Sequence, residues 1–476
     1  MLLIRHHFTR SDSTGHYPFV RNISPPLGLV YLATILNEND KNAAIKILDS
    51  KALNMTVDQT KTAIKEFKPD MIGITSISEA LPGAVELGEI CKNLFPDTLR
   101  ILGGPHMSTN PVPVMKLGLF QLGVIGEGEI TMKEIYDAYK NSGEIPTAIK
   151  GTCVYKDGNI ITNEPRPRIL DLDTLPIPNR AFLDNKIYSS YLARRPYTYM
   201  MTTRGCPFKC AFCFRTVWGR KVSFTSSRRI LEEIKDCLER FKIKEIAFKD
   251  DTFTINKKVI LELCDMIKKE KLKVRWTVFT RVNTVDEELL KVMKSAGCYK
   301  IDFGVESGDQ DMLNLMEKGI TLEQVRTIFK LCRDLGIQTH AFFMIGYPTE
   351  TEETAEKTIR FAREIADWVS FAATSCLEGT RLYEFAVKEG YLVPKPINAL
   401  LGESDVENLC NSPELPTERI LQLVNEAYKR FYLRPSHMLR LLGFMIKDGT
   451  ILNFFKTLPY ILSRLFGKFQ VLKRNA

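Results

Sequence analysis

The stretch Thr203-Arg204-Gly205-Cys206-Pro207-Phe208-Lys209-Cys210-Ala211-Phe212-Cys213-Phe214-Arg215 contains three cysteines at the spacing C-x3-C-x2-C. The run before it, residues 197–203, is β-rich and predicts a strand, so the cysteines should lie in the loop at its carboxyl end. In a barrel of parallel strands, that end carries the chemistry. Three thiolates on a short loop can hold three irons of a [4Fe–4S] cluster and leave the fourth iron open.

Zinc is the alternative ligand for such a group of thiols. A structural zinc site usually has four nitrogen or sulfur ligands. No fourth ligand is near in sequence, because the next cysteine is Cys237 and the next histidine is His340. The spacing therefore favours an iron–sulfur cluster.

Length and composition indicate a folded protein of two to three domains. The chain has 476 residues, 44% hydrophobic and 26% charged. The apolar opening at residues 1–4 is too short for the core of a signal peptide, and no stretch reaches the roughly 18 apolar residues of a membrane span. The 11 cysteines form no regular framework, which favours a reducing cytoplasm as the location.

The net charge of +9 lies at the C-terminus. Residues 428–476 contain ten of the 66 Lys and Arg but one of the 57 Asp and Glu, so 56 of each sign remain elsewhere. Apolar helices predicted at 438–446 and 451–469 carry cations among large apolar residues, as helices at a membrane interface do. A helical cap over the barrel is an equal alternative. We expect no nucleic-acid partner, because no aromatic stacking platform accompanies the charge.

The first 150 residues alternate predicted strands and helices. Strands are predicted at 1–4, 44–48, 71–75, 100–102 and 121–125, and helices at 27–36, 57–67, 84–94 and from 130. This order predicts a parallel sheet with helices on both faces and a ligand beyond the carboxyl ends of the strands. The candidate residues at those ends are Ser76, Gly103, Gly104, His106, Gly126, Glu127 and Gly128. Tight turns between strand and helix would explain the glycines equally well.

A second alternating region follows a linker. Four prolines between residues 165 and 178 favour extended chain, after a short β insert at 151–162. Further strands are predicted at 197–202, 245–248, 274–279, 300–304, 339–345 and 368–373. We expect an α/β protein with an N-terminal Rossmann-like domain at 1–150, a linker at 151–192, a partial (β/α)6 barrel at 193–390 and a helical C-terminal region with a basic tail at 391–476.

Polar residues or glycine follow four successive barrel strands. They are Lys249-Asp250-Asp251, Arg281, Glu306-Ser307-Gly308 and Gly346. Any one of them could be a loop residue or a helix cap, as Asp309 could be. Their repetition at the same end of successive strands predicts a site there.

The cysteine spacing, with the aromatic Phe212 before the last cysteine, resembles the signature of radical S-adenosylmethionine (SAM) enzymes. The resemblance implies a [4Fe–4S] cluster on Cys206, Cys210 and Cys213 whose open iron binds SAM. The further SAM contacts that it implies are Asp250 or Asp251 at the amino group, Arg281, Glu306 and Ser307 along SAM and its ribose, Gly346 at the adenine, and Phe212. Lys-Asp-Asp stands here where the family has Gly-Gly-Glu.

The N-terminal order of motifs is similar to the cobalamin-binding domain of B12-dependent radical SAM enzymes. The motifs are Pro25-Pro26-Leu27-Gly28-Leu29, Gly73-Ile74-Thr75-Ser76, Gly103-Gly104-Pro105-His106 and Gly126-Glu127-Gly128-Glu129. The motif Asp-x-His-x-x-Gly, which ligates cobalt, is absent. The resemblance therefore implies a cobalamin without a protein histidine on cobalt.

Together these resemblances imply cleavage of SAM to a 5′-deoxyadenosyl radical and methylation of an unactivated carbon. Relatives with this layout include hopanoid methylases and the anaerobic Mg-protoporphyrin cyclase. A small molecule is the expected substrate, with a lipid or isoprenoid favoured if the tail contacts a membrane peripherally. The expected electron donor is a flavodoxin or ferredoxin. The alternative is a non-methylating radical reaction, such as cyclisation, carbon–carbon coupling or dehydration, with a degenerate cobalamin domain.

Overall fold

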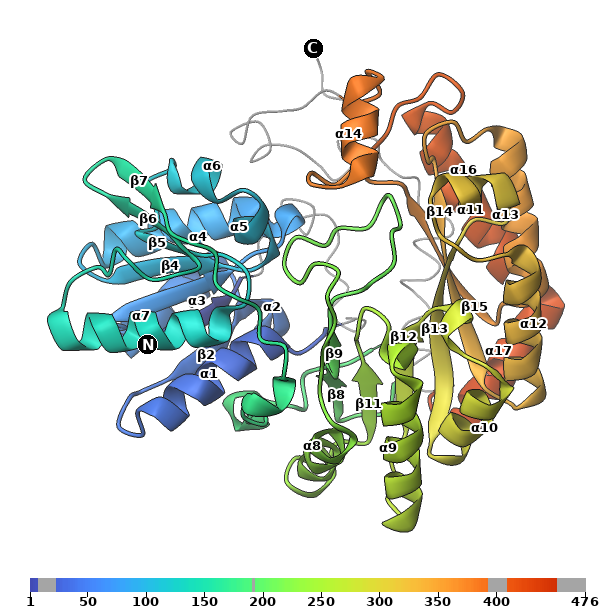
Figure 1. Cartoon of the computed structure of the whole chain (residues 1–476), viewed down its shortest axis with the longest axis horizontal. Helices are drawn as coiled ribbons and strands as arrows, with labels where there is room; N and C mark the ends of the chain where they lie inside the picture. The colour runs from blue at the N-terminus through green and yellow to red at the C-terminus, as the bar shows by residue number, and fades with distance from the viewer. Residues whose placement is uncertain (7–22, 191–192, 393–408, 452–476) are drawn as a thin grey trace.

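The structure is a computed structural model that describes residues 1–6, 23–190, 193–392 and 409–451. Two α/β units lie side by side, and the loop that follows β9 (Thr203–Arg204) lies between them (Figure 1). The first unit carries the N-terminal residues. The second carries the cysteine loop and the helices that follow.

The N-terminal unit is a seven-stranded sheet of order β2-β1-β3-β4-β5-β6-β7. Its strands are β1 (Leu2–Arg5), β2 (Lys46–Asp49), β3 (Met71–Thr75), β4 (Leu99–Gly103), β5 (Leu122–Val124), β6 (Thr152–Lys156) and β7 (Asn159–Thr162). Its helices are α1 (Leu27–Asn39), α2 (Ser50–Leu53), α3 (Val57–Phe67), α4 (Leu81–Leu94), α5 (Pro105–Thr109), α6 (Pro111–Met115) and α7 (Gly128–Ser142). The sheet has a hydrophobic core on each face, one with α1 and α7 and the other with α3, α4 and α6. The predicted two-sided arrangement is confirmed.

The sheet is not wholly parallel, contrary to the sequence-based expectation. Strands β1 to β5 are parallel, but β6 pairs with β5 and with β7 in antiparallel fashion. The hairpin that was expected as an insert in the linker is therefore an edge of this sheet. Val154 and Cys153 are fully buried against its two cores, which local sequence patterns could not indicate.

The second unit is a curved six-stranded parallel sheet of order β15-β14-β13-β12-β11-β8. Its strands are β8 (Tyr197–Met200), β11 (Glu245–Phe248), β12 (Trp276–Thr280), β13 (Cys298–Glu306), β14 (Gln338–Ile345) and β15 (Trp368–Ala373). Its helices are α8 (Ser227–Glu239), α9 (Lys257–Lys269), α10 (Glu287–Ser295), α11 (Gln310–Leu315), α12 (Leu322–Asp334) and α13 (Glu352–Ile365). Alternate strand residues such as Ile301, Phe303 and Val305 pack against these helices in one large core. The predicted partial barrel is confirmed.

The C-terminal region is helical, as predicted. Helix α14 (Arg381–Lys388) precedes it, and the helices among its described residues are α16 (Thr417–Tyr432) and α17 (Pro435–Asp448). Helix α16 protects the edge strand β15, because Tyr432 and Tyr428 accept hydrogen bonds from the amides of Val369 and Phe371 at 3.0 and 3.1 Å. Most of the helix predicted at 451–469 lies outside the described residues. None of the described helices is long and apolar enough to cross a membrane.

Candidate active site

The cysteines lie in a long loop closed by a short antiparallel ribbon of β9 and β10 (Ser223–Phe224). Gly205 begins the loop at φ +94°, and a Cβ there would lie 2.5 Å from the carbonyl oxygen of Lys221. The loop is pinned to the barrel, since the amide of Ala211 donates to Met316 at 2.9 Å and its carbonyl accepts from Leu382 at 3.1 Å. The ribbon and these contacts fix the loop at the carboxyl ends of the barrel strands.

Barrel residues contact the thiols directly. Arg281 donates to Cys210 Sγ at 3.2 Å, and its guanidinium lies 3.9 Å from the ring centre of Phe208. Thr252 Oγ1 lies 3.6 Å from Cys206 Sγ. Burial first, and then the neighbouring cysteines, raise the pKa of Cys213 to about 11. The thiol must lose its proton when it binds metal, so iron binding and deprotonation are coupled here.

The donor set fits an iron–sulfur cluster. Three thiols stand on one loop, and a guanidinium beside Cys210 can balance thiolate charge. Within the described residues, no three His, Cys, Asp or Glu side chains are grouped as ligands of a single metal ion. Each cysteine ligand of a [4Fe–4S] cluster binds a different iron, so the three thiols need not lie as close together as the ligands of a single metal ion.

The two aspartates after β11 hold the cysteine loop. Asp250 Oδ1 accepts from the amide of Thr202 at 2.7 Å and from the amide and hydroxyl of Thr203. Asp251 accepts from the amide of Gly205 at 3.1 Å. Burial raises the pKa of Asp250 to about 6, against the effect of these hydrogen bonds. Its Oδ2 is buried without a partner among the described residues, so one oxygen remains for a ligand.

The other expected SAM contacts differ in their surroundings. Glu306 has φ +75° and pairs with Lys318 at 2.7 Å beside the ring of Phe212. Such strain in a residue other than glycine is typical of functional sites. Ser307 is fully buried and its hydroxyl lies 3.1 Å from that of Thr358 on α13.

Gly346 is required by packing. It has φ +89°, and a Cβ there would lie 2.4 Å from Ile420 on α16. Its amide donates to Glu350, which is buried. The structure therefore places helix α16, rather than open space, beside this glycine.

The candidate residues of the N-terminal domain meet at the carboxyl edge of its sheet. A Cβ on Gly104 would lie 2.7 Å from the carbonyl oxygen of Ser76, so Gly104 permits the two loops to touch. A Cβ on Gly126, at φ +79°, would meet nothing within 4 Å, and one on Gly103 would meet only Val124 at 3.8 Å. Gly128 opens α7, where a Cβ would lie 3.4 Å from Leu32. Gly103 and Gly126 thus leave space for a bulky ligand.

His106 offers a free nitrogen at this edge. Its Nδ1 lies 3.1 Å from Ser78 Oγ, and its buried Nε2 has no partner within the described parts of the chain. Burial lowers its pKa, so the ring is neutral at pH 7. A neutral ring that retains one hydrogen-bonding position fits a polar ligand such as cobalamin, whose periphery carries amides.

Glu127 contacts the cysteine loop. Arg204 donates to Glu127 Oε1 at 2.7 Å and to Glu129 Oε1 at 2.5 Å, and all three side chains are buried. The other oxygen of Glu127 accepts from the amide of Ile169 at 2.8 Å. The sequence pattern predicts Glu127 as a cofactor contact but gives no such role to Arg204 or Glu129. The motifs Gly-Glu-Gly-Glu and Arg-Gly-Cys, which contain these residues, are both present in the sequence. Only the tertiary fold brings them together.

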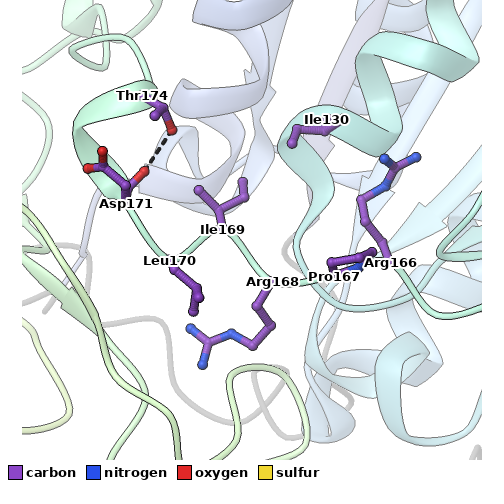
Figure 2. Close-up of a pocket in the computed structure, with 8 residues that line it drawn as sticks. All are labelled: Ile130, Arg166, Pro167, Arg168, Ile169, Leu170, Asp171 and Thr174. Atoms are coloured by element: carbon purple, nitrogen blue, oxygen red, sulfur yellow. Dashed lines mark hydrogen bonds between the residues drawn. The ribbon is translucent and has the colours of Figure 1, made fainter.

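A cavity of about 420 Å³ is lined by the linker near this ion pair, since Ile169, whose amide binds Glu127, is one of its lining residues. It lies along the linker beside Ile130, the residue after Glu129 (Figure 2). The residues that line it are Ile130, Arg166, Pro167, Arg168, Ile169, Leu170, Asp171 and Thr174. Arg166 pairs with Glu134, and Arg168 donates to the hydroxyl of Ser223 at 2.9 Å, so both guanidinium groups already have protein partners.

Comparisons with known proteins identify both units. The B12 binding domain matches residues 20–136 and the radical SAM superfamily matches residues 200–362. An uncharacterized methyltransferase of Pyrococcus horikoshii is 34% identical over 90% of this chain and 93% of its own. The chain belongs to the radical SAM superfamily, in its group with an N-terminal B12 binding domain. The anaerobic magnesium-protoporphyrin IX monomethyl ester cyclase of Rubrivivax gelatinosus is 29% identical over 73% of this chain and 64% of its own.

The solved structures include the same arrangement of domains. The radical SAM methyltransferase TsrM of Kitasatospora setae, with cobalamin and a [4Fe–4S] cluster bound, has a TM-score of 0.69 at 19% identity. The alignment covers 91% of this chain and 89% of that one, which shows a common fold. The cofactors of this radical SAM enzyme are a [4Fe–4S] cluster, SAM and cobalamin.

Proposed function

We propose that this enzyme methylates an unactivated carbon with cobalamin and SAM. The contact of Arg204 with Glu127 and Glu129 carries the proposal. Arg204 lies two residues before Cys206, and both glutamates follow β5, at the carboxyl edge where a doubly wound sheet binds its ligand. The contact holds the expected cobalamin edge against the expected cluster loop, as transfer of a methyl group between neighbouring cofactors requires.

In this proposal the three thiolates hold the cluster, and barrel residues keep the loop in place. When bound, the cluster, SAM and cobalamin supply an electron, a hydrogen-abstracting radical and a methyl group. Arg281 balances charge at Cys210, while Asp251 fixes the turn at Gly205. A flavodoxin or ferredoxin is the proposed electron donor.

The cobalamin is proposed to lie over Gly103 and Gly126, where the backbone is open. His106 Nε2 would hydrogen-bond to a peripheral amide of the corrin, since its Nδ1 is engaged by Ser78. Cobalt would have no histidine ligand from an Asp-x-His-x-x-Gly motif, because that motif is absent from the sequence.

A mainly apolar substrate with a polar end, such as a lipid or isoprenoid, is proposed for the barrel interior. Phe279 and Phe342 point to the inner face of the sheet, with ring centres 5.3 Å apart. Asp302, which is in register with Phe279, pairs with Lys300 at 3.1 Å and with Lys249 at 3.4 Å. The aromatic pair would contact an apolar chain, and the lysines would face an acidic or hydroxyl group.

The test is anaerobic reconstitution with iron, sulfide and hydroxocobalamin, followed by desalting and an absorbance spectrum. The expected result is an iron–sulfur band together with near-stoichiometric retained corrinoid. The loaded enzyme is then incubated with reductant, methyl-deuterated SAM and a lipid extract, and mass spectrometry should find deuterated methyl groups on carbon. A cluster without retained corrinoid would contradict the methylation proposal.

A cyclisation or other non-methylating radical reaction is the second candidate, favoured by the similarity to the magnesium-protoporphyrin ester cyclase. The two reactions leave different products from SAM. Methylation that consumes SAM both as radical source and as methyl source gives 5′-deoxyadenosine and S-adenosylhomocysteine together. The second candidate gives no S-adenosylhomocysteine during turnover.

A further inference from the structure

Exposed apolar side chains are concentrated on and just before α17. Among the described residues, 13 large hydrophobic side chains are exposed, and five of them lie between residues 433 and 446. They are Leu433, Met438, Leu439, Leu442 and Ile446. The other eight are spread over the chain between Leu53 and Phe385, as is ordinary for a protein surface.

The exposed residues of α17 form one continuous face. At about 100° per residue, Met438, Leu442, Ile446 and Leu439 fall within an arc of about 100° on the helix. Gly443 extends this arc, and a Cβ there would meet nothing within 4 Å. No charged residue of α17 falls inside the arc, so the face is uniformly apolar.

The side of α17 next to this face is fixed to the barrel. His437, Leu441 and Met445 are buried on that side. Asp448 ends the helix and binds Arg275 at 2.9 Å and Gln338 at 2.8 Å. These contacts hold the apolar face outward.

The charge on α17 beside this face, and in the sequence that follows the helix, is positive. Lys447 is exposed on the side of the helix that follows Leu439 and Gly443, and Arg440 on that same side pairs with Asp367. Beyond α17, residues 449–476 contain no Asp or Glu and five cations, namely Lys456, Arg464, Lys468, Lys473 and Arg474. An apolar helix face followed by cations without acids matches the interior and the headgroups of an anionic bilayer.

We propose that α17 is a membrane-docking surface that places Met438, Leu439, Leu442 and Ile446 at the headgroup–acyl boundary of an anionic bilayer. A second copy of the chain is a poorer occupant, because in each copy the sequence that directly follows α17 carries an excess of cations, and like charges repel. Each nearby cation would raise the affinity for an anionic surface roughly fivefold.

The docking surface lies away from the cysteine loop. Gln338 begins β14 and Arg275 precedes β12, so the end of α17 is at the amino ends of the barrel strands. The cysteines lie at the carboxyl ends. Membrane docking is therefore independent of the proposed reaction and would leave the B12 binding domain and the cysteine loop away from the lipid.

The test uses the purified full chain in sedimentation with vesicles of phosphatidylcholine, with and without phosphatidylglycerol. The double variant Leu439→Ser/Ile446→Ser removes apolar area at two exposed positions. The matched control is Leu53→Ser/Ile77→Ser, at two positions that are exposed elsewhere. We expect the wild type and the control to bind phosphatidylglycerol vesicles. The α17 variant should bind them with an affinity that is lower by a factor of about ten or more.

A further variant separates α17 from the C-terminal segment. Lys468→Gln/Lys473→Gln/Arg474→Gln should lower the preference for phosphatidylglycerol. Vesicle binding that depends on these cations but not on Leu439 and Ile446 would overturn the proposal. No binding by the wild type would also overturn it, as would a dimer in solution that the α17 variant abolishes.

Discussion

Glu129 Oε1 lies 2.5 Å from Arg204 Nη2, and this buried ion pair joins the B12 binding domain to the loop of the three cysteines. Arg204 also contacts Glu127 at 2.7 Å and lies over the rings of Tyr31 and Trp218, at 5.5 and 6.0 Å from their centres. One cation is thus enclosed by two carboxylates and two aromatic rings. Buried charges of this kind stabilise a fold only while all their partners are present.

Replacing Arg204 with Met should destabilise the protein strongly. The change leaves Glu127 and Glu129 buried without their common cation, which costs about 3–5 kcal/mol. Chemical denaturation of the purified chain measures the loss. The control is Arg228→Met, because Arg228 and Glu232 form an exposed pair that is worth about 0.5 kcal/mol. Equal effects of the two substitutions would contradict the role of Arg204.

Replacing Cys210 with Ala should abolish the cluster and the cleavage of SAM while leaving the far-UV circular dichroism unchanged. Cys210 lies on a loop outside the hydrophobic cores of both units, so its loss removes a predicted ligand without removing a strand or helix. Cys237→Ala is the control, because Cys237 is buried in the barrel core. That variant should lose some stability but keep the iron–sulfur absorbance. SAM cleavage by Cys210→Ala would refute the assignment.

Two glycines with positive φ should respond differently to alanine. Gly346→Ala places a Cβ 2.4 Å from Ile420 and should cost more than about 2 kcal/mol of stability, because α16 must move. Gly126→Ala adds a Cβ in open space and should cost about 1 kcal/mol, the strain of its φ alone.

The same pair of variants tests the cobalamin edge. After reconstitution, Gly126→Ala should retain less corrinoid than the wild type because the added methyl group occupies the open edge. Gly346→Ala, measured well below its unfolding temperature, should retain corrinoid normally. Normal retention by Gly126→Ala would argue against cobalamin at that edge.

Glu350 should make stability fall with rising pH. Burial raises its pKa to about 7 from the ordinary value of 4.5, so between these pH values the native state holds a proton that the unfolded state has released. Its contribution is therefore full below about pH 4.5 and is lost as the pH rises through about 7, by on the order of 3 kcal/mol. Glu350→Gln should flatten that part of the pH profile, measured by denaturant titration. An unchanged profile would show that another group causes the slope.

The alternation of strands and helices could be read from local sequence. Apolar runs such as Met71–Thr75 and Trp368–Ala373 gave their strands with the same bounds, because buried parallel strands are continuously apolar. The parallel order of the barrel followed from that alternation. The antiparallel pairing of β6 and β7 could not be predicted in this way. The strand that an edge strand pairs with depends on which edge of the sheet the chain reaches, and local sequence does not determine that.

The chemistry of single motifs was also local. Three cysteines in one loop are brought together by the short spacing between them, so the sequence by itself determines that these thiols stand on one loop and predicts them as the cluster ligands. Asp309 likewise caps α11, as its position at the start of a helix suggested.

Only the tertiary structure decided which groups those motifs meet. Backbone amides of the cysteine loop donate to Asp250 and Asp251, and Arg204 donates to Glu127. Helix α16 covers Gly346. Contacts between residues more than 40 positions apart depend on how whole elements pack, and the energy of a buried charge depends on its partners. The local spacing of residues gives information on neither the packing of elements nor the partners of a buried charge. The Arg204–Glu129 contact and the outward orientation of the apolar face of α17 are therefore decided by the tertiary structure.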